Sequence, residues 1–183
     1  MVIQGPGHVG LMCVAAAKIA GASTIIVTGT STDTLRLEAA REAGAHHTFI
    51  VGEEDVIARV KDLTGGSGAD VVMDITALST EAVNQAFDMV KTGGTVLLAG
   101  LKNMAPTEIV TDKIVLNGLT VKGGAGATPG SMNAAVKYLN DGLVNTEALL
   151  GEVLTLDEFD EAMALLKRDH PDRDAIRVTI AHQ

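Results

Sequence analysis

Aromatic residues are nearly absent from this sequence, which has three Phe, one Tyr and no Trp among 183 residues. Proteins that bind single-stranded nucleic acid stack bases on aromatic side chains, so this scarcity argues against that class. Basic residues are also in the minority, with 14 Lys and Arg against 23 Asp and Glu and a formal net charge of −9. Because a phosphate backbone is bound through clustered Lys and Arg, no nucleic-acid partner is predicted.

Cysteine is almost absent as well, since Cys13 is the only one. A single cysteine can form neither an internal disulfide nor a cysteine-rich zinc site. We therefore expect a reducing, cytoplasmic location, with Cys13 buried as a small apolar residue. No run of 18 apolar residues occurs, and no basic segment followed by an apolar one precedes the first motif. Neither a membrane span nor a secretory signal is predicted.

The apolar residues that are present predict an α/β fold. Six short apolar stretches read as strands, at residues 2–4, 24–28, 48–51, 70–75, 95–99 and 119–122. They alternate with helical patterns at residues 9–20, 32–43, 55–64, 80–90 and 111–116. This spacing predicts a doubly wound parallel sheet of six strands with right-handed connections.

Periodicity also predicts which side chains are buried and where the chain turns. The first helix is expected to bury one stripe, made of Val9, Met12, Cys13, Ala16, Ile19 and Ala20. The second helix is expected to bury Leu35, Ala39 and Ala43, with Leu37 beside them. A tight turn at Thr92-Gly93-Gly94 is expected to lead into the fifth strand.

A glycine motif joins the first strand to the first helix. It reads Gly5-Pro6-Gly7-His8-Val9-Gly10 and matches G-x-G-x-x-G. Gly5 permits a sharp turn, Gly7 lets the backbone approach a pyrophosphate, and Gly10 lets the helix pack close to the sheet. Free amides and the helix dipole would hold the phosphate charge. The motif predicts a bound dinucleotide, although a purely structural turn has the same pattern, and His8 either contacts the ligand or faces solvent.

Ligands of a doubly wound sheet lie at the carboxyl ends of its strands, near the point where strand order reverses. The residues that follow each expected strand are therefore candidates for cofactor contacts. Besides the glycine motif, they are Gly29, Thr30, Ser31, Thr76, Ala77, Gly100, Leu101, Gly123, Gly124 and Ala125.

The end of the second strand bears on the choice between NAD and NADP. NAD-binding proteins place an Asp or Glu there, about 20 residues beyond the glycine motif, to bond the adenosine ribose. This chain has Thr28-Gly29-Thr30-Ser31 instead. Without a carboxylate a 2′-phosphate is not repelled, and the hydroxyls of Thr30 and Ser31 could donate to it. NADP is therefore favoured over NAD, with Arg36 as the nearest base. The missing acid also argues against an S-adenosylmethionine site.

Catalytic residues and metal ligands are not predicted in this chain. His46 and His47 are adjacent in a loop, and His170 and His182 lie in the late region. None of them forms a His, Cys and carboxylate cluster with the spacing of a metal site. Tyr138 lies in a predicted helix and is assigned to packing.

Four stretches of the sequence resemble the medium-chain dehydrogenase/reductase family: Gln4–Leu11, Gly65–Val72, Lys91–Val96 and Asp157–Ala162. The proline-containing glycine motif is similar to that of the zinc-type alcohol, polyol and threonine dehydrogenase branch. The resemblance implies a dinucleotide-binding Rossmann domain at residues 1–128. It implies that residues 129–183 are a C-terminal segment that packs on this domain and returns toward an otherwise missing GroES-like catalytic domain. In this family NAD-type members carry Asp where this chain has Gly29.

The resemblance also implies an activity, hydride transfer between an alcohol and a nicotinamide. The cofactor would be NADP or NAD, with its pyrophosphate at Gly7–Val9 and its nicotinamide near Leu101 and Gly123–Ala125. Zinc is expected only in the missing domain, so this chain alone is expected to be inactive. The implied substrate is a small alcohol, polyol or carbonyl compound, and the implied assembly is a homodimer through the sixth strand. A non-catalytic nucleotide-binding module and a methyltransferase stay open as alternatives.

Overall fold

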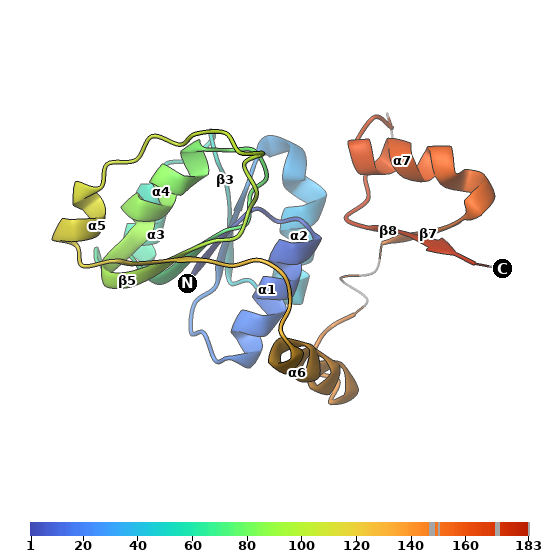
Figure 1. Cartoon of the computed structure of the whole chain (residues 1–183), viewed down its shortest axis with the longest axis horizontal. Helices are drawn as coiled ribbons and strands as arrows, with labels where there is room; N and C mark the ends of the chain where they lie inside the picture. Colours follow the sequence, from blue (N-terminus) through green and yellow to red (C-terminus); the bar gives the residue numbers. More distant parts are fainter. Residues whose placement is uncertain (147–148, 150, 171–172, 183) are drawn as a thin grey trace.

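A computed structural model describes residues 1–146, 149, 151–170 and 173–182. Its main body is a six-stranded parallel sheet with the strand order β3-β2-β1-β4-β5-β6 (Figure 1). The strands are β1 (Val2–Gln4), β2 (Ile26–Gly29), β3 (His47–Ile50), β4 (Ala69–Asp74), β5 (Val90–Leu98) and β6 (Thr120–Gly123). The strand order reverses between β1 and β4, so the predicted doubly wound sheet is confirmed.

Helices cover both faces of this sheet. Alternate residues of a strand point to opposite faces, so Ile3 and Val27 pack under one pair of helices while Val2 and Ile26 pack under the other. The first pair is α1 (His8–Ile19) and α2 (Thr34–Ala43), preceded by the short helix η1 (Ser31–Asp33). The second pair is α3 (Val56–Leu63) and α4 (Glu81–Met89), and α5 (Asp112–Leu116) packs on their side. Burial on both faces explains the uninterrupted apolar runs of β1 and β2.

The predicted buried stripe of the first helix is wrong. Helix α1 buries Gly10, Leu11, Val14, Ala15 and Ala17, whereas Val9 and Met12 are each 45% exposed and Cys13 is half-buried. The helix is apolar on nearly every side, so its periodicity fits more than one stripe. Its rotation is fixed instead by the close approach of Gly10 to the glycine turn. Burial raises the pKa of the Cys13 thiol, which keeps the thiol neutral.

Two further sequence predictions need correction. In α2, the predicted burial of Leu37, Ala39 and Ala43 is confirmed, but Leu35 is 42% exposed. Arg36 is buried in its place, because it bonds to the C-terminal segment described below. In β5, the strand begins at Val90 and includes the predicted turn Thr92-Gly93-Gly94. The pairing of β5 with β4 shifts register at that point, so the extra residues form an irregularity inside one strand.

The strand β6 lies at the edge of the sheet. Within the described part of the chain it pairs only with β5, and all four of its residues are exposed. A homodimer through this strand stays a prediction. Among the described residues, no helix combines the length and apolar character that crossing a bilayer requires.

The last part of the chain forms a small separate layer beside α2 (Figure 1). After α6 (Pro129–Asn140) come β7 (Glu152–Thr155), η3 (Leu156–Glu158), α7 (Phe159–Lys167) and β8 (Val178–Ala181). Strands β7 and β8 pair in parallel, and Leu154, Ala162, Leu165 and Ala175 form a core of their own. We call residues 151–170 and 173–181 the C-terminal lobe. The domain boundary after residue 128 stays a prediction, and residues 147, 148, 150, 171, 172 and 183 of the predicted second segment lie outside the described residues.

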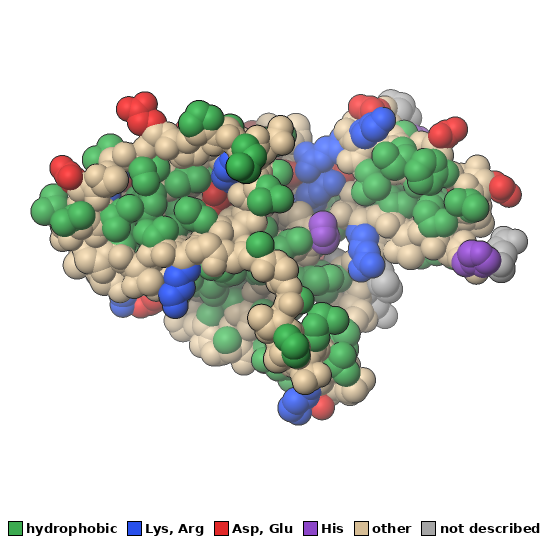
Figure 2. Space-filling model, viewed as in Figure 1, with side chains coloured by type: hydrophobic (Ala, Val, Ile, Leu, Met, Phe, Trp, Pro, Cys, Tyr) green, Lys and Arg blue, Asp and Glu red, His purple; other side chains and the backbone are tan. Residues whose placement is uncertain are grey.

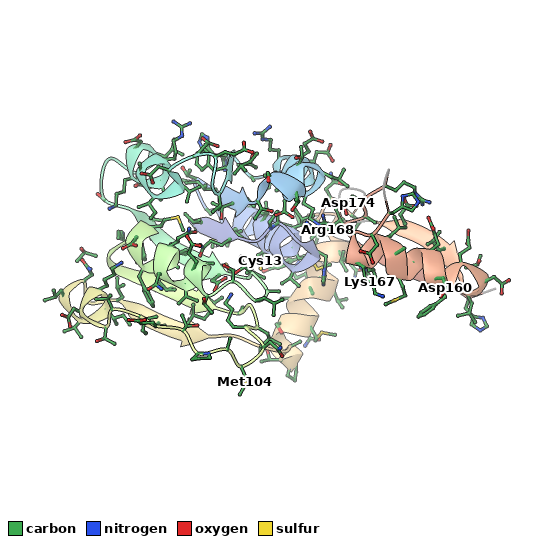
Figure 3. All side chains as sticks on the ribbon, turned by 90° about the horizontal axis from the view of Figure 1, so that it is seen from above. Cys13, Met104, Asp160, Lys167, Arg168 and Asp174 are labelled. Atoms are coloured by element: carbon green, nitrogen blue, oxygen red, sulfur yellow. The ribbon has the colours of Figure 1, made fainter. Side chains whose placement is uncertain are left out.

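An ion pair between a buried arginine and a partly exposed aspartate attaches the C-terminal lobe to α2. Arg36 donates from Nη1 to Oδ2 of Asp174 at 2.5 Å, from Nη2 to Oδ1 at 3.0 Å, and to the carbonyl of Ala175 at 2.8 Å. Its side chain is only 8% exposed. Leu149 is also buried, in the core beneath α1 and α2. In Figure 3, Asp174 and Arg168 both lie on the side of the lobe that faces these helices.

We expect the substitution Asp174→Asn to lower the free energy of unfolding by about 1–3 kcal/mol, because it leaves a buried guanidinium without its anion. Urea unfolding followed by circular dichroism measures this change. The matched control is Asp141→Asn, which removes an ion pair between exposed side chains, Lys137 and Asp141. The control should change stability by less than about 1 kcal/mol. Equal effects of the two substitutions would show that the Arg36 pair does not attach the lobe.

Candidate functional site

A cavity of about 440 Å³ opens at the carboxyl ends of β1, β2 and β4. The glycine motif forms its floor, and Thr76 and Ala77 after β4 form one wall. The start of α4 and the residue Val51 after β3 complete this part of the lining. Thr30 and Asp33 after β2, together with Arg168 from the C-terminal lobe, line the other end. Figure 2 shows basic side chains gathered in the hollow between the sheet and the lobe.

The glycine motif adopts the geometry that its sequence predicts. Gly5 has φ of +100°, a conformation that side chains disfavour, and its amide donates to the carbonyl of Thr28 at 2.9 Å. A Cβ atom on Gly10 would lie 2.0 Å from the carbonyl oxygen of Gly5. A Cβ atom on Gly7 would meet nothing within 4 Å. Glycine is therefore required at position 10 for the packing of α1 on the turn. At position 7, the absence of a side chain leaves space in which a ligand can approach the backbone.

The N-terminus of α1 faces this open space. The first hydrogen bond of the helix runs from the amide of Leu11 to the carbonyl of Gly7 at 2.9 Å. The amides of His8, Val9 and Gly10 precede it and have no carbonyl within the helix to bond. Gly7 has no side chain to cap them, and the first turn contains no acidic residue. Positive helix-end charge and free amides together make a site for an anionic group.

Gln4 is a buried polar residue in the lining of the cavity. It is 2% exposed, and its Nε2 donates to the carbonyl of Ala82 at 3.0 Å. Its Oε1 accepts no hydrogen bond from any described residue. A buried acceptor of this kind normally has a partner, so a donor from a bound ligand or an ordered water fits here.

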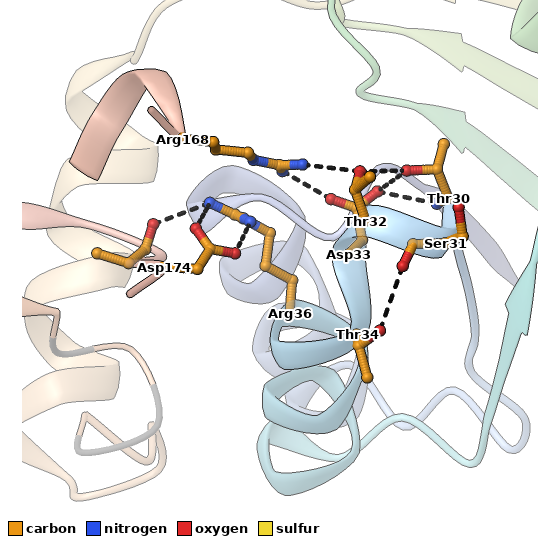
Figure 4. Close-up of polar contacts among 9 residues, drawn as sticks. Thr30, Ser31, Thr32, Asp33, Thr34, Arg36, Arg168 and Asp174 are labelled. Carbon is orange, nitrogen blue, oxygen red and sulfur yellow. Dashed lines mark hydrogen bonds and ion pairs between the residues drawn. The ribbon is translucent and has the colours of Figure 1, made fainter. Parts of the chain in front are cut away.

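A network of polar contacts occupies the end of β2 (Figure 4). Oδ2 of Asp33 accepts from the Thr30 amide at 2.8 Å and from the Thr30 hydroxyl at 2.7 Å. Arg168 donates from Nη2 to Oδ1 of Asp33 at 2.7 Å and from Nη1 to the hydroxyl of Thr32 at 3.0 Å. Burial alone raises the pKa of Asp33, but the hydrogen bonds from Thr30 and Arg168 outweigh it, and the pKa lies below its ordinary value. Asp33 is thus an ionised carboxylate.

Asp33 corrects the sequence-based description of this strand end. Residues 28–31 carry no carboxylate, but Asp33 follows in η1 and reaches the cavity wall. The spacing Thr30-Ser31-Thr32-Asp33 is that of a capping box, which was a usable signal for a carboxylate turned back toward the strand. Arg168 lies 135 residues further along the chain, and no local pattern identifies it.

The structure brings together only part of the predicted set. All six residues of the glycine motif line the cavity with Gly29, Thr30, Thr76 and Ala77, and His8 is exposed there. The cavity lining does not include Ser31, Arg36, Gly100, Leu101, Gly123, Gly124 or Ala125. Arg36 is bonded to Asp174, and Leu101 is 80% exposed. Gly123 ends β6, and Gly124 and Ala125 follow it; this strand lies three strands from β1 in the sheet. Their contacts with a cofactor stay predictions.

A buried ion pair that the sequence analysis missed supports the wall after β4. Asp74, at the end of β4, is 0% exposed, and Nζ of Lys102 lies 2.8 Å from its Oδ2. Lys102 also donates to the carbonyl of Thr76 at 2.6 Å and to its hydroxyl at 2.9 Å. The Thr76 hydroxyl in turn donates to Oδ1 of Asp74 at 2.6 Å. The pair thereby fixes Thr76 in the cavity wall, and a lone Asp closing the apolar run of β4 was its sequence signal.

Metal-binding groups do not gather in the described part of the chain. No three His, Cys, Asp or Glu side chains there are close enough to hold an ion. His46 has a structural role, because its Nδ1 accepts from the amide of Ile25 at 3.0 Å. The arrangement at the cavity therefore offers binding and orientation of an anionic ligand, and no site for a metal.

Comparison with known proteins identifies the family. A family model described as "Zinc-binding dehydrogenase" matches residues 9–141. A sorbitol dehydrogenase of Halalkalibacterium halodurans is 32% identical over 167 residues, which are 91% of this chain and 48% of that protein. An L-threonine 3-dehydrogenase of Bacillus subtilis is 32% identical over 166 residues, 90% of this chain and 47% of that protein. The chain thus spans about half the length of these relatives.

Solved structures agree with this result. The alcohol dehydrogenase TADH from Thermus sp. ATN1 superposes with a TM-score of 0.87 at 25% sequence identity. The match covers 99% of this chain and 50% of that one. The fold and the family are therefore shared over nearly the whole of the present sequence.

Proposed function

The chain belongs to the zinc-binding dehydrogenase family, and from this premise we propose that it binds a nicotinamide dinucleotide, NAD or NADP, in the cavity at the ends of β1, β2 and β4. In this role it is the cofactor-binding part of an alcohol dehydrogenase-like oxidoreductase. The observation that carries the proposal is the contrast between Gly10 and Gly7. Gly10 has no room for a side chain, whereas Gly7 has open space beside its backbone, on the side of the cavity.

The residues of the cavity suit the parts of such a cofactor. The free amides at the start of α1 would bind the pyrophosphate, and the first turn of this helix contains no acidic side chain. The adenosine ribose would lie at the end of β2, beside Thr30, Asp33 and Arg168. The nicotinamide would extend past Thr76, which Lys102 and Asp74 hold in place. The unsatisfied Oε1 of Gln4 offers one further acceptor to a ligand or a water.

A bound nicotinamide would supply the hydride acceptor or donor. The residues of this chain bind it, orient it and cover one side of it. The described residues do not fit a zinc site, because no three His, Cys, Asp or Glu side chains among them lie close enough to hold the ion. The chain matches about half the length of its relatives. We propose that in an active enzyme of this family the other half binds zinc and the substrate, which is a small alcohol, polyol or carbonyl compound. A nucleotide-binding chain without catalysis remains the alternative, and it would use the same cavity.

Calorimetric titration of the whole chain with NADPH, NADH and S-adenosylmethionine tests the proposal. We expect a nicotinamide nucleotide to bind with a dissociation constant between about 1 μM and 1 mM, and S-adenosylmethionine not to bind. We expect no oxidation of sorbitol or threonine by this chain, with or without added zinc, because no described cluster holds the metal. Binding of S-adenosylmethionine alone, or of none of the three ligands, would contradict the proposal. Turnover by this chain would contradict the proposed division of the active site.

A further inference from the structure

We propose that Arg168 of the C-terminal lobe selects NADP over NAD by binding the 2′-phosphate of the adenosine ribose. The inference rests on the proposed function and assigns a residue and a direction to its cofactor preference. It replaces Arg36, the base predicted from the sequence.

Arg168 is the cation at the ribose end of the cavity. Among the described residues of the lining it is the only Lys or Arg. Its side chain is 40% exposed, so it is accessible to a ligand. Arg36 is excluded from this role because its side chain is 8% exposed and its guanidinium is bonded to Asp174 and Ala175.

The described residues hold the guanidinium of Arg168 in position without using all of its N–H donors. Asp33 and Thr32 accept one hydrogen bond each from it, and a guanidinium has five N–H donors. The remaining donors can pair with two phosphate oxygens in the planar geometry that favours Arg over Lys.

The backbone also fixes Arg168. It ends α7 with φ of +60°, and its amide donates to the carbonyl of Leu165 at 3.1 Å. This left-handed conformation is uncommon for a residue with a side chain, and it turns the chain at the edge of the lobe. The side chain is thereby presented to the end of β2, as Figure 4 shows.

The neighbouring carboxylate does not exclude a phosphate. Asp33 is a charge of the sign that repels the 2′-phosphate of NADP, but Arg168 pairs with it. The two carboxylate oxygens of Asp33 already accept hydrogen bonds from Thr30 and Arg168. They are therefore not free to accept hydrogen bonds from both ribose hydroxyls of NAD, as an unpaired carboxylate would be. The pair of Asp33 and Arg168 leaves this end of the cavity near neutrality. We infer that Arg168 donors not used by Asp33 and Thr32 bind the 2′-phosphate.

The test compares Arg168→Ala with Arg173→Ala in the whole chain. Arg173 belongs to the same lobe and has similar exposure, but it pairs with Glu152 and Glu161 and does not line the cavity. Fluorescence titration measures the dissociation constants of NADPH and NADH. We expect the unmodified chain to bind NADPH more tightly than NADH. We expect Arg168→Ala to weaken NADPH binding about tenfold or more and NADH binding less than about threefold, while Arg173→Ala changes neither.

Two further measurements separate recognition of the phosphate from a loss of structure. The unmodified chain should bind 2′,5′-ADP at least about tenfold more tightly than 5′-AMP, because the two ligands differ by the 2′-phosphate alone. Arg168→Lys, which keeps the charge but loses the planar fork, should have intermediate NADPH affinity. Equal affinities for 2′,5′-ADP and 5′-AMP, tighter binding of NADH, or equal weakening of both nucleotides by Arg168→Ala would overturn the inference. Failure of every nucleotide to bind would instead overturn the proposed function.

Discussion

The substitution Gly10→Ala is expected to lower the free energy of unfolding by at least about 3 kcal/mol. The added Cβ atom would lie 2.0 Å from the carbonyl oxygen of Gly5 and 3.1 Å from its carbonyl carbon. Both are backbone atoms, so the clash cannot be relieved by the movement of a side chain. Helix α1 must instead shift away from β1, the strand to which the glycine motif connects it. Urea unfolding monitored by circular dichroism measures the loss. The control is Gly130→Ala near the start of α6, where the nearest atom to a new Cβ is 3.9 Å away. This control should be neutral or stabilising by up to about 1 kcal/mol.

Gly7→Ala should separate folding from binding at the same loop. Gly7 has φ of −69°, and its Cβ would meet no atom within 4 Å, so stability should change by less than about 0.5 kcal/mol. The methyl group would lie where a pyrophosphate must approach the backbone, so the affinity for NADPH or NADH should fall at least about tenfold. Unchanged affinity in this variant would mean that the nucleotide binds away from the start of α1.

The features that the sequence predicted are those coded by neighbouring residues. The glycine motif sets its own backbone conformation within six residues, and uninterrupted apolar runs identify strands covered on both faces. Strand order then follows from right-handed connections of ordinary length. The rotation of α1 is not coded in this way, because Val9, Met12 and Leu11 are equally apolar. It depends on a contact between Gly10 and Gly5 that only the folded turn creates.

The polar parts of the site depend on contacts across the chain. Arg36 was predicted as a cofactor-binding base because it is the nearest basic residue to the end of β2, but it is bonded to Asp174, which lies 138 residues away. Arg168 reaches Asp33 over a similar separation. Sequence spacing cannot predict such pairs, because one partner belongs to the segment after β2 and the other to the C-terminal lobe. The C-terminal lobe therefore supplies the positive charge of Arg168 to the ribose end of the cavity, and no local sequence motif predicts this contact.

The second large effect is expected from Lys102→Met, which should lower the free energy of unfolding by about 3–5 kcal/mol. It leaves the carboxylate of Asp74, which is 0% exposed, without its cation. The hydrogen bonds from Thr76 to Oδ1 of Asp74 stabilise the negative charge only in part. Chemical unfolding measures the change, and Lys113→Met is the matched control. The pair between Lys113 and Asp88 is about one-third exposed, so its loss should cost less than about 1 kcal/mol.

A double-mutant cycle with Asp74→Asn assigns the effect to the pair. Asn has the shape of Asp without the charge, so the double variant should be more stable than the sum of the single losses predicts, by about 1–3 kcal/mol. The cycle also bears on binding, because Lys102 holds the carbonyl and hydroxyl of Thr76 in the cavity wall. Nucleotide affinity should fall in Lys102→Met and stay unchanged in Lys113→Met. Additive losses in the cycle would show that Asp74 and Lys102 act independently, and that the wall after β4 is held by backbone pairing with β1 and β5 alone.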